Sequence, residues 1–145
     1  MDKKPYFTRY STSLWIRFLR FILTANKNLQ ESLEKLGLTP PQFYVLASIG
    51  YSGRLPFGEI GVKMMVTVSN LTGIVDRLEE KSLVVRERDK HDRRVVHVKL
   101  TEKGKKLYRV SVPTFENSVA DFFSSLDNSQ QKELSTLLRK LLSSP

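Results

Sequence analysis

Residues suited to catalysis are sparse in this chain of 145 residues. Its only two histidines are His91 and His97, and no serine or carboxylate motif frames either of them. The chain also has no glycine-rich phosphate loop and no H-E-x-x-H spacing. Because it contains no cysteine, thiolate metal ligands and disulfides are excluded. We therefore expect no catalytic site, no metal site and no cofactor.

A short run after Thr67 carries side chains suited to contact with DNA. Asparagine can bind adenine through two hydrogen bonds, hydroxyls can reach bases or phosphates, and arginine binds phosphate or guanine. The outward positions of the predicted helix over 68–81 also include Gly73, which would let the backbone come close to DNA. On their own these positions fit a solvated helix face equally well. The candidate DNA-binding residues in this run are Thr67, Ser69, Asn70, Thr72 and Arg77.

A basic tip between two strand-like runs follows, over residues 89–94. Arg93 and Arg94 can insert guanidinium groups into a narrow, electronegative minor groove. Arg88 and Lys90 are further candidate DNA contacts beside them. A helix with short polar side chains directly before an arginine-tipped ribbon favours DNA binding over the solvated-face interpretation.

Two acidic residues near these cations are expected to orient arginines. Asp92 lies two residues before Arg94 and can hold that side chain in place. Asp76, in the predicted helix, can play the same part by reaching the wing.

Net charge is concentrated around these candidate sites. The whole chain has a formal charge of +9, and residues 63–109 alone hold thirteen Lys/Arg against seven Asp/Glu. Residues 110–145 hold three Lys/Arg against four Asp/Glu. This local excess favours a binding surface for a polyanion over charge that serves solubility alone.

The N-terminal segment and the apolar runs predict no membrane contact. No apolar run approaches the roughly 18–20 residues of a transmembrane helix. Residues 1–12 have neither a continuous apolar segment nor a small-residue cleavage site, so we expect no signal peptide. We therefore expect the protein to be cytoplasmic.

The elements that must position the candidate residues are mainly helical. Apolar periodicity and capping residues predict helices over 8–35, 41–51, 57–65 and 68–81, and strands over 83–88 and 95–100. We expect the 41–51 helix to bury one face, and strand 95–100 to point Val96, Val98 and Leu100 inward and His97 outward. A further helix begins after Thr101, with a kink or break expected near Val112 because of Pro113. The last helix begins at residue 127 or 129.

This order predicts a mainly α fold with a small β-wing, a winged helix-turn-helix flanked by long terminal helices. Residues 1–38 form an N-terminal dimerisation helix, residues 39–101 the DNA-binding region, and residues 102–145 C-terminal dimerisation helices. The first helix carries an apolar stripe too wide for a small domain to bury, so a partner chain is the expected cover. A single large core within the chain is the alternative.

The runs LGLTPPQFYVL, SNLTGIVDRLEEKSLVVRERDKHDRR and VHVKLTEKG resemble the MarR family of bacterial transcription regulators. The likeness covers nearly the whole chain, and the D-x-R wing followed by L-T-x-x-G is its most specific part. The resemblance implies an obligate homodimer that binds double-stranded, pseudo-palindromic operators, usually as a repressor. It also implies that a small aromatic or anionic effector can release the DNA.

Three positions depart from the family pattern. Met65 occupies a turn where glycine is common, and Ser82 replaces the usual glycine before L-V. We therefore expect a different turn geometry at Met65. Gly73 stands where many members have arginine, so the operator sequence does not follow from the resemblance.

Candidate effector contacts are Trp15, Arg17, Phe18 and Phe43, on the helices that line the family's pocket. Each has a plainer interpretation, since the aromatic residues also suit a core and Arg17 also suits the surface. The absence of cysteine excludes thiol-based peroxide sensing. Two other functions stay open: a nonspecific architectural nucleic-acid-binding protein, and a small-molecule carrier.

Overall fold

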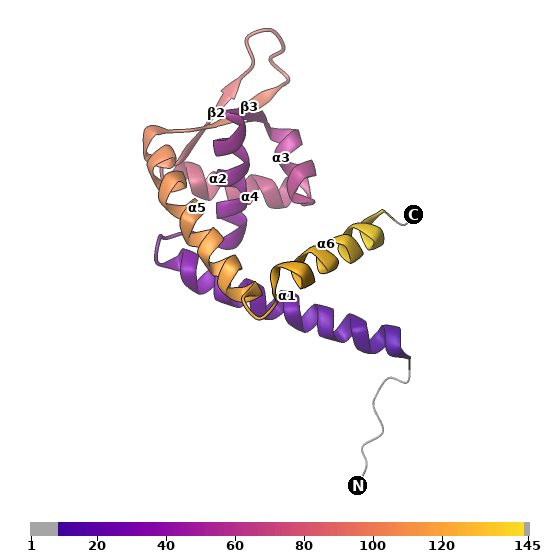
Figure 1. Cartoon of the computed structure of the whole chain (residues 1–145). Helices are drawn as coiled ribbons and strands as arrows, with labels where there is room; N and C mark the ends of the chain where they lie inside the picture. The colour runs from indigo at the N-terminus through magenta and orange to yellow at the C-terminus, as the bar shows by residue number, and fades with distance from the viewer. Residues whose placement is uncertain (1–8, 144–145) are drawn as a thin grey trace.

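The computed structural model describes residues 9–143 (Figure 1). In chain order these form α1 (Tyr10–Glu34), α2 (Pro40–Ser52), β1 (Arg54–Pro56), α3 (Phe57–Met64), α4 (Val68–Glu80), β2 (Val84–Arg88), β3 (Val96–Leu100), α5 (Glu102–Phe123) and α6 (Asn128–Leu142). The mainly helical fold with a small winged sheet is therefore as predicted. Residues 1–8, including the predicted start of the first helix and most of the segment assessed as a signal peptide, lie outside the described residues. None of the helices within 9–143 is long and apolar enough to cross a membrane.

Side-chain caps set the starts of the helices as expected. The hydroxyl of Thr67 accepts a hydrogen bond from the Asn70 amide at 3.3 Å, and Thr101 accepts one from the Gly104 amide at 3.0 Å. Asp127 accepts two from the amides at the start of α6, at 2.8 and 2.9 Å. These bonds satisfy amides that have no partner inside the helix, so the starts of α4, α5 and α6 were predictable from sequence.

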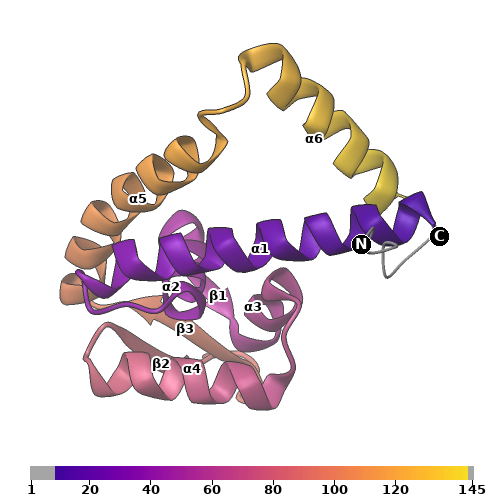
Figure 2. The same cartoon turned by 90° about the horizontal axis from the view of Figure 1, so that it is seen from below.

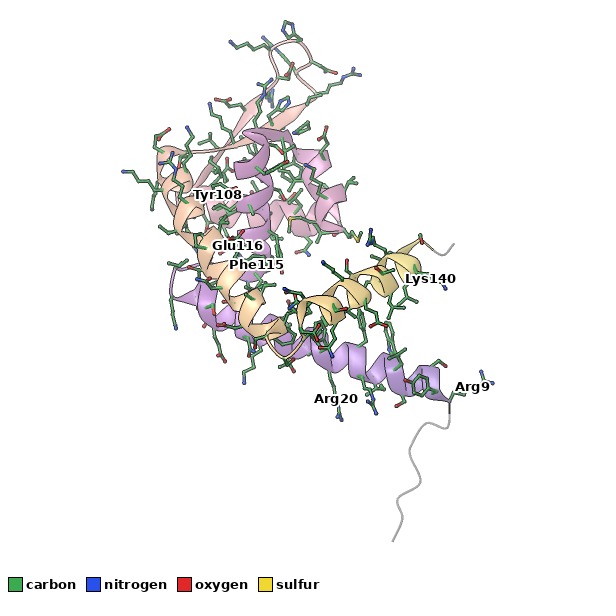
Figure 3. All side chains as sticks on the ribbon, viewed as in Figure 1. Arg9, Arg20, Tyr108, Phe115, Glu116 and Lys140 are labelled. Carbon is green, nitrogen blue, oxygen red and sulfur yellow. The ribbon has the colours of Figure 1, made fainter. Side chains whose placement is uncertain are left out.

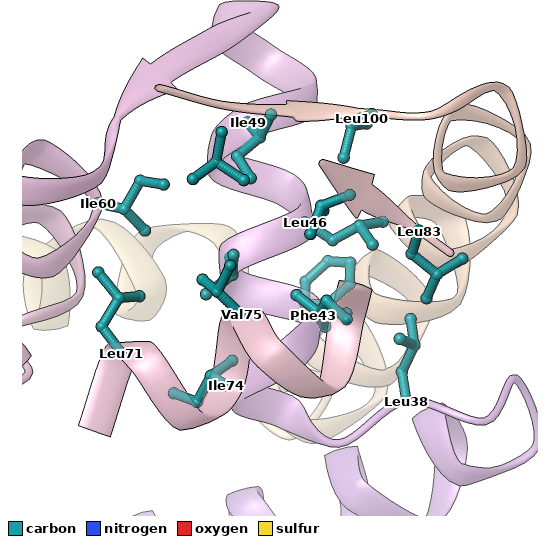
Figure 4. Packing of buried hydrophobic residues seen from close by; sticks show 14 of the residues in the cluster. Leu38, Phe43, Leu46, Ile49, Ile60, Leu71, Ile74, Val75, Leu83 and Leu100 are labelled. Carbon is teal, nitrogen blue, oxygen red and sulfur yellow. The ribbon is translucent and has the colours of Figure 1, made fainter. Parts of the chain in front are cut away.

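Helix α2 is the centre of the core, and the prediction that it buries one face was incomplete. Six of its residues are buried, and they point in several directions around the axis. Side chains from α3, α4 and the sheet meet those of α2 (Figure 4). A helix that is apolar all round must be enclosed, and α2 positions α4 by filling the space behind it. The buried residues of α2 are Pro40, Gln42, Phe43, Val45, Leu46 and Ile49.

The sheet has a third strand that the sequence analysis missed. Strand β1 pairs antiparallel with β3, which pairs with β2, so the order is β1-β3-β2. Strand β3 is therefore central, and His97 lies between Pro56 and Glu87. His97 lies on the opposite face of β3 from the buried Val98 and Leu100, and its side chain is nevertheless only 13% exposed.

Helix α5 runs without a break across Pro113, so the break that was one of the two expectations near Val112 does not occur. Proline removes one backbone donor, which favours a break in an isolated helix. Here tertiary packing offsets that loss, because Val112 and Phe115 both pack against the core. The ring of Phe115 stacks on that of Phe43, with centroids 4.7 Å apart.

The terminal helices extend away from this core. Helices α1 and α6 project from the lobe in Figure 1, and with α5 they form three sides of a triangle in Figure 2. In α1 only Leu29 and Leu33 are buried, and none of the described residues of α6 is. Many apolar side chains on both helices are exposed, which is the stripe that the sequence predicted; they include Leu14, Trp15, Leu19, Leu23, Leu137, Leu141 and Leu142.

Candidate nucleic-acid interface

Helix α4 lies at the outer edge of the lobe, on the side away from α1 (Figure 2). Its buried positions are the four that sequence periodicity predicted: Leu71, Ile74, Val75 and Leu78. Its other side is exposed at Ser69, Asn70, Thr72 and Gly73, and also at Arg77. The apolar face holds α4 against the core, and the polar face is left free for a ligand.

The wing is formed by β2 and β3, and its tip extends beyond the rest of the lobe (Figure 1). Asp89 organises the tip, since its Oδ1 accepts hydrogen bonds from the amides of His91 at 2.8 Å and Asp92 at 3.2 Å. These backbone bonds lower the pKa of Asp89. The Asp89 amide donates to the carbonyl of Val95 at 2.9 Å, which closes the loop. The tip is therefore held by its own acid and backbone.

Arg94 is held at the tip by Asp92. The Nε of Arg94 lies 3.0 Å from Oδ1 of Asp92, and its Nη2 lies 3.1 Å from Oδ2. The Arg94 amide donates to the same Oδ1 at 3.0 Å. The paired side chain and the amide lower the pKa of Asp92, and the carboxylate raises that of Arg94. The Arg94 side chain is nonetheless 91% exposed, so it is oriented but not covered.

Asp76 reaches an arginine of the wing, as expected. Its partner is Arg86 of β2, with Oδ1 and Nη2 2.8 Å apart. Arg86 also pairs with Glu79, and its guanidinium lies 5.4 Å from the ring centre of Phe57. Arg86 therefore joins α4, the wing and α3. A sequence signal existed, because Asp76 and Glu79 are three residues apart on one helix face, but the contact depends on how β2 crosses α4.

The other predicted DNA contacts are cations spread over α4 and the wing. Arg77, Arg88, Lys90 and Arg93 are all exposed. Among the described residues, no contact joins these four side chains to Arg94. What groups them is their position on α4 and on the wing that follows it.

A separate open cavity of about 540 Å³ lies between α2, α3 and α5. Its walls include Phe43, one of the four predicted effector contacts, and the labelled residues Tyr108, Phe115 and Glu116 (Figure 3). The other three, Trp15, Arg17 and Phe18, are not among its lining residues. They are exposed on α1. The α5 side of this cavity was not predicted from sequence. The available signal was the pair of aromatic residues, Tyr108 and Phe115, on one helix.

Known proteins resemble this chain over most of its length. The HTH-type transcriptional repressor MdtR of Bacillus subtilis is 35% identical over 111 residues, which cover 77% of this chain and 72% of the repressor. The sequence model of the MarR family matches residues 38–96. The chain belongs to the MarR family. A crystal structure of a mutant MarR from E. coli complexed with operator DNA has a TM-score of 0.84 and 27% identity, covering 90% of this chain and 94% of that one. A MepR like protein complexed with pseudoligands has a TM-score of 0.70 and 33% identity, covering 93% of this chain and 94% of that one.

In this MarR-family chain, two residues other than glycine have the left-handed backbone conformation that usually favours glycine. Met65 has φ +52° in the turn before α4, and Ser82 has φ +57° in the turn before β2. At Met65 the left-handed turn forms with methionine in place. The Val66 amide still donates to the carbonyl of Gly61 at 3.1 Å. An L-residue in this region costs about 1–2 kcal/mol, which the surrounding fold supplies.

Proposed function

We propose that this chain is a homodimeric transcription regulator that binds a pseudo-palindromic DNA operator sequence-specifically and represses transcription until an effector binds. The observation that carries the proposal is the exposed α4 beside a wing whose Arg94 is held outward by Asp92. The local positive charge and the similarity to a MarR mutant complexed with operator DNA support it further. In this proposal α4 enters the major groove and Arg94 the flanking minor groove.

The terminal helices would form the dimer. The exposed apolar side chains of α1 and α6 need a cover that residues 9–143 do not provide, and in this proposal a second copy supplies it. The division into residues 1–38, 39–101 and 102–145 follows from this arrangement and belongs to the proposal. The two copies of α4 would then lie about one helical turn of DNA apart, roughly 34 Å.

The proposed effector is a small aromatic or anionic molecule. The cavity between α2, α3 and α5 supports this class because its lining combines Phe43, Tyr44 and Tyr108 with the cationic Lys63. Burial raises the pKa of Tyr44, so its hydroxyl stays a hydrogen-bond donor. Because Lys63 and Met64 belong to α3 and precede the turn into α4, occupation of the cavity would shift the lobe and favour a spacing that misfits the operator. The parts that Trp15, Arg17 and Phe18 play stay predictions.

A regulator of this kind works on genomic DNA in the cytoplasm and catalyses no reaction. The similarity of this chain to the transcriptional repressor MdtR and to the MarR mutant complexed with operator DNA supports that assignment. One feature favours a nonspecific architectural protein instead: Gly73 leaves α4 without the arginine that many family members carry there.

The test is the operator affinity of Arg94→Ala. Operator fragments are selected from genomic DNA with the wild-type dimer, and affinity is measured by fluorescence anisotropy at fixed salt. Loss of one minor-groove arginine is expected to cost on the order of 1–3 kcal/mol. The control is Arg20→Ala, which removes the same charge from α1, at the other end of the molecule from the wing (Figure 3). Equal affinities of Arg94→Ala and wild type would contradict the assignment of the wing.

A further inference from the structure

The N-terminal half of α4 exposes only small or uncharged side chains. These are Val68, Ser69, Asn70, Thr72 and Gly73. The charged residues of the exposed side, Asp76, Arg77 and Glu80, all lie in its C-terminal half. Carboxylates at that end are repelled by phosphates, so the N-terminal half is the part suited to enter a groove deeply. This matches the way recognition helices present their first residues to base edges.

Two methyl-bearing side chains dominate this half. Val68 is 66% exposed although it is aliphatic. Thr72 lies one turn further on the same ridge, and its hydroxyl donates to the Val68 carbonyl at 2.9 Å. The hydroxyl proton is therefore used inside the helix and is not available to a base. The methyl group is the substituent of Thr72 that remains for the exposed side.

Gly73 determines how close this ridge can come to DNA. A Cβ built at Gly73 would have no atom within 4 Å, so the space beside the helix there is open. A long side chain in that place would fill the space between this side of the helix and the base edges. With glycine, the methyl groups of Val68 and Thr72 can approach a base to van der Waals distance.

We propose that Val68 and Thr72 set the operator specificity by packing against the C5-methyl groups of thymine, so that α4 selects A·T pairs in each half-site. This inference rests on the proposed function and names the bases that its recognition helix reads. Thymine is the base that presents a methyl group in the major groove, and apolar side chains recognise it by contact. The same half of α4 has no arginine or lysine to bind guanine through two hydrogen bonds, and Asn70 suits the adenine of a neighbouring pair.

The experiment removes one methyl group at a time from the DNA. Half-sites are first selected from a random double-stranded pool with the full-length wild-type dimer. Each thymine of the selected half-site is then replaced by uracil, which differs only by the C5-methyl group, and affinity is measured at fixed salt. At one or two thymines the replacement is expected to weaken wild-type binding about fourfold, the value for loss of one buried methyl group.

Variants then assign the contact to residues. Val68→Ala and Thr72→Ser each remove methyl groups from the protein, and Thr72→Ser keeps the hydroxyl. Each should abolish the uracil effect at its own thymine and leave the effect at other positions. The control Val62→Ala removes an equally aliphatic side chain that is 79% exposed on α3, and it should leave every uracil effect unchanged.

The outcomes separate the inference from the proposed function. A selected half-site without thymine, or with thymines indifferent to uracil, overturns the inference while sequence-specific binding stands. Uracil effects that persist unchanged in both Val68→Ala and Thr72→Ser overturn the assignment to these residues. A pool that shows no enrichment at all contradicts the proposed function itself.

Discussion

The start of α5 approaches Leu83, the residue before β2, so closely that only glycine fits at position 104. A Cβ at Gly104 would lie 2.0 Å from the Leu83 carbonyl oxygen and 3.0 Å from its carbon. The first distance is about 1 Å below the shortest contact that real Cβ atoms make. The clashing atoms belong to the backbone of Leu83, so no side-chain rotation can relieve the clash. Moreover, the same oxygen accepts hydrogen bonds from the Thr101 amide at 3.1 Å and hydroxyl at 3.3 Å.

Gly104→Ala is therefore expected to destabilise the protein by about 1–3 kcal/mol. Overpacking costs about 1–3 kcal/mol and a lost hydrogen bond about 1 kcal/mol, offset by the better helix propensity of alanine, about 1 kcal/mol. Gly73→Ala makes the same change in a helix where the added Cβ meets open space, and it should stabilise by about 0.5–1 kcal/mol.

Urea unfolding followed by circular dichroism measures both variants. The protomer concentration is held equal, because the stability of a dimer depends on it. Opposite signs for the two substitutions are the expected result. A Gly104→Ala protein as stable as the wild type would show that α5 does not approach Leu83 in this way, and the description of this junction would be wrong.

Two further predictions concern the turns and the wing. Ser82→Gly should raise the free energy of unfolding by about 0.5–1 kcal/mol, because Ser82 has φ +57° and glycine adopts this conformation without strain. The control Ser118→Gly, inside α5, should lower the free energy of unfolding. Equal losses in both variants would refute the strain at Ser82. The carboxyl groups of Asp89 and Asp92 have lowered pKa values in the folded protein, so their stabilising contribution is present above the unfolded value of about 3.9 and is lost as pH falls through the folded values. Carbon-detected NMR titration should therefore find both midpoints below that of an unfolded peptide of the same segment, and midpoints at or above the peptide's would contradict the wing geometry.

The elements that local chemistry determines were predictable from sequence. The start of α4 depends on the Thr67 cap and its buried face on a 3.6-residue period, and both signals lie within a few residues of one another. The same holds for the Asp92–Arg94 pair, whose members are two residues apart.

The features that sequence analysis missed depend on distant parts of the chain. Strand β1 has three residues and pairs with β3, where Leu55 lies opposite Val98. Without that partner the segment Arg54–Pro56 gives no strand signal, because it is short and ends in proline. The contact of Asp76 with Arg86 likewise requires the angle between α4 and β2. Continuity of α5 across Pro113 requires the packing of Phe115 on Phe43, which no local pattern shows.

A ratio of affinities distinguishes a sequence-specific regulator from a general DNA-binding protein. The dissociation constant of the wild-type dimer is measured for a selected genomic fragment and for random DNA of equal length, at the same salt concentration. A sequence-specific regulator is expected to bind the selected fragment at least about 10³-fold tighter than random DNA. Nearly equal dissociation constants, each falling in the same way with salt, would contradict it and support the nonspecific architectural protein.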